Sequence, residues 1–147
     1  MTHVAQTAAL VTAGVNALAG GVGGLFWWRV EPSRVFWLLC RAGQLAALVL
    51  AGAAGVLAAS GHRPGDRLFW LYALLPVVVS FVAEGLRLSA AQTVLDQRGL
   101  EDAQAVGRLD EAGQRSVVLA IVRREMGTMA VGCLTMAFLA LRAWGTA

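Results

Sequence analysis

Apolar residues fill four long stretches of the chain and leave few polar positions between them. The predicted spans run over about 4–28, 34–60, 67–95 and 116–144, and the first contains no charged residue. A helix needs about 20 mainly apolar residues to cross the hydrocarbon core of a bilayer. No stretch alternates apolar and polar residues as the strands of a membrane barrel do. The pattern therefore predicts an all-α, four-helix transmembrane bundle.

Residues that start helices lie between these spans. Pro32 suits the first turn of a helix, so the second helix is expected to begin near Ser33. Gly61, Pro64 and Gly65 break the chain, and Asp66 is placed to cap the third helix.

The segment between the last two spans is expected to project from the membrane. Gly99 is the predicted end of the third helix, a short amphipathic helix is expected over 100–112, and the last helix begins at Arg115 or Ser116. The chain thus reads as one integral membrane domain, 1–147, with a helical cytoplasmic extension between helices 3 and 4.

Arginine supplies all 12 basic residues, and its distribution predicts the orientation. Four spans place the turn after the first helix and the segment after the third on the same side. Basic residues near span ends favour the cytoplasm. We therefore expect a bacterial cell membrane protein with both termini extracytoplasmic. The first side holds or borders Arg29, Arg34, Arg41, Arg87, Arg98, Arg108, Arg115, Arg123 and Arg124, and the other side holds Arg63, Arg67 and Arg142.

Composition argues against several classes of function. Only 14% of residues are charged, against about 25% in a soluble domain. The arginines gather at helix ends, so the basic balance does not indicate nucleic acid. His3 and His62 fall outside the spans, which argues against a buried bis-histidine haem, and no cofactor is predicted. Cys40 and Cys133 are interpreted as free thiols.

Small residues recur on the first two helices and predict close helix packing. Small side chains let membrane helices approach closely and gain van der Waals contact. The partner helix could belong to this chain, to a second copy or to a larger membrane complex. Asn16 is expected to bond across such a contact. The predicted packing residues are Gly20, Gly21 and Gly24 in the first helix and Ala47, Ala51 and Gly55 in the second.

A buried polar cluster is predicted toward the cytoplasmic leaflet. Folding the second and third helices antiparallel brings Arg41 level with Glu84, and an unpaired charge in lipid is costly. We expect an Arg41–Glu84 ion pair. The cluster is either a structural collar that fixes helix register or a site for a proton, an anion or a lipid headgroup. Its predicted members are Arg41, Gln44, Glu84, Arg87, Arg124 and Glu125.

A polar stripe is expected on the third helix, where Tyr72, Pro76 and Ser80 are spaced by four and continue to Glu84. Proline inside a helix removes a hydrogen bond and kinks it. A broken helix that lines a polar path is typical of transporters. A kinked helix with a back-bonded serine explains the same spacing and is favoured.

Soft ligands share one face of the last helix, namely Met126, Met129, Cys133 and Met136. Thioethers and thiolates select Cu(I), but the same residues commonly fill apolar cores. We interpret this face as packing.

The runs FWWRVEPSRVFW, followed by RAGQ, and SFVAEGLRLSAAQTVLD resemble small, uncharacterised four-helix integral membrane proteins of actinobacteria. The resemblance implies a four-helix membrane fold and no known activity. The leading hypothesis is a non-enzymatic accessory or scaffolding subunit that packs laterally in the lipid bilayer. The alternatives are a transporter or channel for protons, small ions or Cu(I), and a lipid- or quinone-binding membrane enzyme.

Overall fold

The computed structural model describes residues 2–61 and 64–147, so the expectations for His62 and Arg63 lie outside it. Within the described ranges the chain is helical and contains no strand. Four helical segments are long and apolar enough to cross a membrane, which indicates a multi-pass membrane protein. The helices are α1 (Thr2–Arg29), α2 (Arg34–Ala59), α3 (Leu68–Leu88), α4 (Ala90–Gln97), α5 (Ala103–Gly107) and α6 (Glu111–Thr146).

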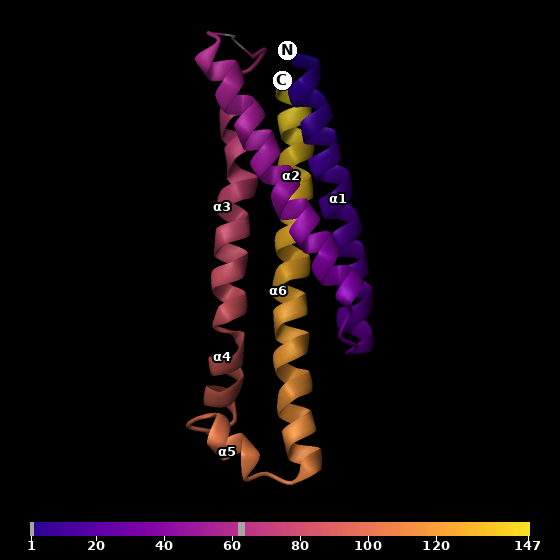
Figure 1. Cartoon of the computed structure of the whole chain (residues 1–147), viewed down its shortest axis with the longest axis vertical. Helices are drawn as coiled ribbons and strands as arrows, with labels where there is room; N and C mark the ends of the chain where they lie inside the picture. The colour runs from indigo at the N-terminus through magenta and orange to yellow at the C-terminus, as the bar shows by residue number, and fades with distance from the viewer. Residues whose placement is uncertain (1, 62–63) are drawn as a thin grey trace.

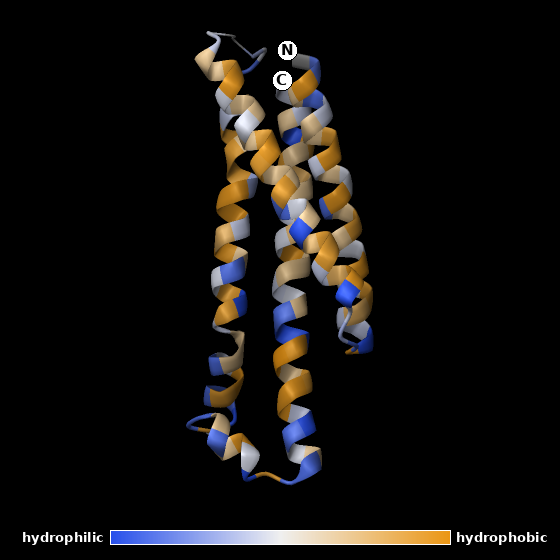
Figure 2. Cartoon of the chain, viewed as in Figure 1, coloured by the Kyte–Doolittle hydropathy of each residue, from blue (hydrophilic) through white to orange (hydrophobic). Residues whose placement is uncertain are grey.

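The four long helices lie side by side, with α6 between α1 and α3 and with α2 packed against both α1 and α3 (Figure 1). The two termini lie at the same end. At the other end α4, α5 and the first turns of α6 extend past the turn between α1 and α2. Hydrophilic residues concentrate in this extension, whereas apolar residues dominate the long helices (Figure 2).

The predicted start of the second helix at Ser33 is confirmed by a capping bond, and Asp66 bonds the first residue of α3, although the residue directly before that helix is Arg67. The Ser33 hydroxyl accepts from the Phe36 N–H at 3.2 Å, and the Asp66 carboxylate accepts from the Leu68 N–H at 2.9 Å. At the end of α4, Gly99 has φ of 65°, a left-handed conformation that glycine adopts without steric cost.

The predicted boundaries in the extension are wrong in two places. α6 begins at Glu111, ahead of the expected Arg115, because the Asp110 carboxylate accepts from the Gly113 N–H at 2.9 Å and caps the helix. The expected helix over 100–112 is only the five-residue α5, capped by Asp102.

The third span is continuous through its proline but interrupted further on. Pro76 lies inside α3, and the one-residue break between α3 and α4 falls at Ser89. The Ser89 hydroxyl donates to the Leu86 carbonyl at 3.0 Å, and Thr93 donates to the Ser89 carbonyl at 2.8 Å. Back-bonding of this kind tends to bend helices. The break does not fall at the proline, and backbone hydrogen bonds continue across it, from the Ser89 N–H to the Gly85 carbonyl at 3.2 Å and from the Thr93 N–H to the Ser89 carbonyl at 3.0 Å.

Candidate functional site

Glu84 of α3 lies at the centre of a polar cluster between α2 and α3. Its Oε1 accepts from Arg41 Nη1 at 2.6 Å and from Gln44 Nε2 at 2.9 Å, and its Oε2 accepts from Arg87 Nε at 2.7 Å. Arg41 Nη1 also donates to Gln44 Oε1 at 2.7 Å. The predicted Arg41–Glu84 ion pair is therefore present. Because charged donors hold both carboxylate oxygens, the geometry stabilises the anion and is poorly suited to carrying a proton.

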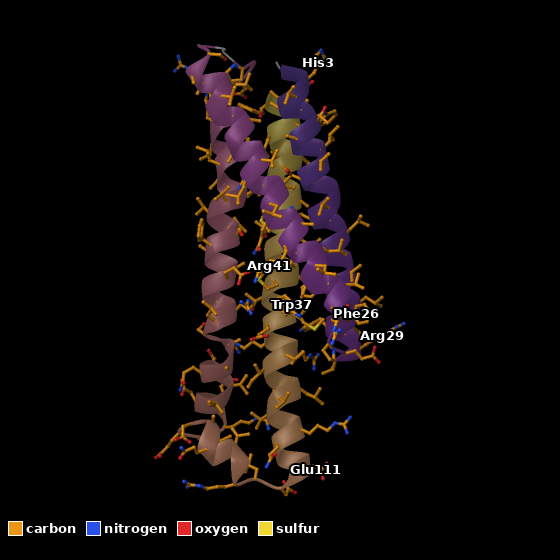
Figure 3. All side chains as sticks on the ribbon, viewed as in Figure 1. His3, Phe26, Arg29, Trp37, Arg41 and Glu111 are labelled. Carbon is orange, nitrogen blue, oxygen red and sulfur yellow. The ribbon has the colours of Figure 1, made fainter. Side chains whose placement is uncertain are left out.

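The cluster faces outward more than the sequence indicated. The side chain of Arg41 is 55% exposed, against 21% for Glu84 and 24% for Arg87. Arg87 is partly covered by Trp37, whose ring centroid lies 5.5 Å from the guanidinium carbon. Figure 3 shows Arg41 and Trp37 above the end of α1, where Arg29 lies. The expectation of a buried cluster is therefore wrong: Arg41 is exposed, and Gln44, Glu84 and Arg87 are only half-buried.

Arg124 and Glu125 do not join the cluster, contrary to prediction. Arg124 is exposed and Glu125 is half-buried, and neither forms an ion pair with any residue that the structure describes. The rotation of α6 instead places the neighbouring Arg123 over the Trp27 ring, at 4.8 Å from its centroid. The register of α3 against α6 also separates Arg124 from the cluster: a Cβ atom on Gly132 would lie 2.9 Å from Ala83, and Arg124 comes eight residues before Gly132, about 12 Å along the helix.

The residues of the predicted polar stripe on α3 have different neighbours in the structure. Tyr72 contacts Arg142 of α6, at 5.5 Å from ring centroid to guanidinium carbon, and Pro76 is buried. Ser80 borders the polar cluster instead. The expected back-bond of Ser80 is not found, since its hydroxyl makes no hydrogen bond to any described residue. These residues do not form one continuous polar path.

The four soft side chains of α6 are all buried in one core, and Cys40 of α2 lies among them. The Cys40 and Cys133 sulfurs are 3.6 Å apart, and both cysteines are free. Sequence reasoning missed this pair because α2 and α6 are far apart in the chain. Among the described residues no group of three or more His, Cys, Asp or Glu side chains could hold a metal. The buried members are Cys40, Met126, Met129, Cys133 and Met136.

The inner face of α1 packs closely against its neighbours. A Cβ atom built on Gly20 would lie 2.5 Å from Cγ of Leu134 in α6, so any larger residue at position 20 would have to displace Leu134. Asn16 Nδ2 donates across to the Gly43 carbonyl of α2 at 3.1 Å, as predicted for Asn16. The Asn16 Oδ1 atom is buried without a hydrogen-bond partner in the described chain.

The other predicted packing residues divide between alanines that are covered and glycines that are not. Ala47 is fully buried and Ala51 is half-buried, but a Cβ atom on Gly21, Gly24 or Gly55 would meet nothing within 4 Å. Gly20 and Gly24 are therefore not used together, although they form a GxxxG pattern. We use "outer face of α1" for the exposed and half-exposed residues Leu10, Gly14, Ala17, Gly21, Gly24 and Trp28, which share one side of the helix.

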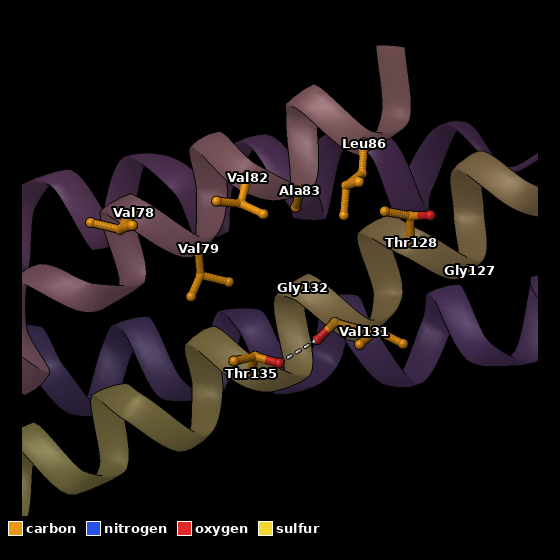
Figure 4. A pocket seen from close by; sticks show the side chains of 10 residues that line it. All are labelled: Val78, Val79, Val82, Ala83, Leu86, Gly127, Thr128, Val131, Gly132 and Thr135. Carbon is orange, nitrogen blue, oxygen red and sulfur yellow. Dashed lines mark hydrogen bonds between the residues drawn. The ribbon is translucent and has the colours of Figure 1, made fainter. Parts of the chain in front are cut away.

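A groove of about 530 Å³ runs between α3 and α6 (Figure 4). Its lining is aliphatic apart from Thr128 and Thr135, whose hydroxyls donate to carbonyls of their own helix. The groove therefore offers hydrocarbon contact and no free polar group. The lining comprises Val78, Val79, Val82, Ala83, Leu86, Gly127, Thr128, Val131, Gly132 and Thr135.

Comparisons of the chain with protein-family models, with curated proteins and with solved structures find no significant match.

Proposed function

We propose that the chain is a non-enzymatic subunit of the bacterial cell membrane, a four-helix transmembrane bundle that packs laterally against a second copy or a larger membrane complex. The outer face of α1 carries this proposal. Three glycines on that face, Gly14, Gly21 and Gly24, have no atom of the described chain within 4 Å of a Cβ position. The inner face of the same helix uses glycine to bring helices together, and the outer face repeats that chemistry.

Small residues promote association here because lipid, and not water, surrounds these helices. Lipid tails are as apolar as leucine, so membrane helices associate through close packing and hydrogen bonds rather than through burial of apolar surface. The small residues between Leu10 and Trp28 let a partner helix approach closely, and larger side chains would prevent that approach.

The test compares two adjacent glycines on opposite faces. Gly21→Leu is expected to abolish self-association in bilayers, measured by energy transfer between labelled copies, while leaving the melting temperature unchanged. Gly20→Leu is the matched control and should lower the melting temperature. If wild-type copies do not associate and the native membrane yields no co-purifying partner, the proposal fails.

The orientation forms part of the proposal. The extension of α4 and α5 is assigned to the cytoplasm and both termini to the outside, because arginines are concentrated at the end that bears the extension. A reporter fused after Ala147 should be extracytoplasmic, and one inserted at Gly107 cytoplasmic. The reverse result would contradict the orientation.

Cu(I) handling is the second candidate, since one observation favours it. The 3.6 Å separation of the Cys40 and Cys133 sulfurs, within a core that also holds three methionines, provides soft donors on two helices. We expect the purified protein to carry no stoichiometric copper. Bound Cu(I) that is lost in Cys40→Ser and Cys133→Ser would reverse the order of the two candidates.

A further inference from the structure

A small cleft opens between α2 and α3 beside the polar cluster. Its volume is about 210 Å³. We call it the α2–α3 cleft; its lining residues are Arg41, Gln44 and Leu48 from α2 and Val77, Ser80, Phe81 and Glu84 from α3. The groove between α3 and α6 lacks any free polar group, whereas this cleft combines charged and apolar walls.

The polarity of the cleft changes along the helix axes. On α2 the lining passes from Arg41 to Leu48, and on the antiparallel α3 it passes in the same direction from Glu84 to Val77. Seven residues of helix span about 10 Å on each side. One end of the cleft is therefore charged and the other end, about 10 Å away, is apolar, which is the polarity of an amphiphile that stands along the membrane normal.

The sequence of α2 places the charged end near the membrane–water interface, at the edge of the hydrocarbon core. Trp37 precedes Arg41 by one helical turn, about 6 Å, and tryptophans favour the membrane–water interface. The apolar end then points toward the middle of the bilayer. This direction matches a lipid whose headgroup lies beside Arg41 and whose acyl chain runs beside Leu48.

The charged end also carries hydrogen-bond donors that no described residue accepts from. Arg41, Arg87 and Glu84 together carry a formal charge of +1. Arg41 uses only its Nη1 toward described residues, and its side chain is 55% exposed. An exposed guanidinium at the edge of the hydrocarbon core is costly without an anion. Ser80 adds a hydroxyl that makes no hydrogen bond within the described chain.

We propose that the α2–α3 cleft binds one anionic phospholipid. The phosphodiester accepts hydrogen bonds from Arg41 and Ser80, its single negative charge balances the +1 of the cluster, and one acyl chain lies against Leu48, Val77 and Phe81. Charge-assisted bonds from arginine to phosphate are among the strong hydrogen bonds of proteins. Basic pockets between membrane helices bind anionic headgroups on the same principle. The proposal is independent of lateral packing through α1.

Native mass spectrometry of the full chain in mild detergent tests this site. The probes are palmitoyl-oleoyl phosphatidylglycerol, phosphatidylcholine with the same chains, and inorganic phosphate. Phosphatidylglycerol is expected to bind at one site and to be retained over phosphatidylcholine. Arg41→Gln should weaken that binding by about tenfold. Arg124→Gln, which removes the same charge from an exposed residue of α6, should leave it unchanged.

Two further outcomes keep the site testable. Leu48→Phe leaves the ion pair intact and fills the apolar end, so it should weaken phosphatidylglycerol binding even if Arg41→Gln fails to fold. Equal retention of the two lipids, equal effects of Arg41→Gln and Arg124→Gln, or unchanged binding in Leu48→Phe would each overturn the proposal. Displacement of the lipid by equimolar inorganic phosphate would also overturn it and indicate a small-anion site.

Discussion

The two faces of α1 carry similar small residues, yet the described chain covers only one of them. A Cβ atom on Gly20 would lie 2.5 Å from Leu134, whereas one on the adjacent Gly21 would meet nothing within 4 Å. The residue type is the same, and only the direction around the helix differs. A small-residue pattern therefore shows that a helix can be approached closely, while its rotation decides which neighbour approaches.

The largest effect on stability is expected for a substitution that disrupts the packing of the inner face of α1. Gly20→Leu forces a branched side chain into the space of Leu134, and overpacking of this kind costs about 1–3 kcal/mol. We expect a clear loss of thermal stability in detergent, measured by circular dichroism. Gly21→Leu serves as the control and should melt as the wild type does. Equal stability of the two variants would contradict the contrast between the faces.

A second contact joins helices by charge rather than by close approach. In a double-mutant cycle of Arg41→Leu and Glu84→Leu, Glu84→Leu alone should destabilise the protein most, because it leaves both Arg41 and Arg87 without a carboxylate, and the two single effects should not add. The exposure of Arg41 and the competing bond from Arg87 reduce the expected coupling to about 1–2 kcal/mol. Additive single effects on the melting temperature would show that the pair contributes nothing.

The smallest effect is expected for Asn16→Leu, which tests whether a hydrogen bond is needed to hold the inner face of α1 against α2. Asn16→Leu keeps the approximate shape of the side chain and removes its bond to the Gly43 carbonyl. Such bonds average about 0.6 kcal/mol in membrane helices, and the change also removes the unpartnered Oδ1. Thermal unfolding should therefore change by less than about 1 kcal/mol. A loss of several kcal/mol would mean that the bond, and not the close approach, holds α1 against α2.

The sequence predicted the contacts that a short connection determines. α2 and α3 are joined by one loop, so an antiparallel register placed Arg41 level with Glu84, and the structure pairs them. Helical character and four membrane-length segments followed from apolar content alone. The caps at Ser33 and Asp66 followed from side-chain chemistry close to each helix start.

The contacts that depend on helix rotation were not predictable in this way. The pairing of Cys40 with Cys133 joins helices far apart in the chain, and no connection fixes their relative angle. Arg124 is exposed and lies outside the cluster, because Gly132, eight residues further along α6, is the residue that lies beside Ala83. The early start of α6 was a different error, because Asp110 is an ordinary capping residue that the sequence displays and that the helix prediction overlooked.

Disulfide trapping in native membranes tests the central claim, lateral packing through the outer face of α1, most directly. Ala17→Cys places a thiol in the middle of that face, and Phe138→Cys, 62% exposed before substitution, places one on α6 as a control. Oxidation should link Ala17→Cys to a second copy, at twice the mass of the 15.4 kDa chain, or to one defined partner, and should leave Phe138→Cys and the wild type unlinked. Linkage of Ala17→Cys no greater than that of Phe138→Cys would contradict the claim.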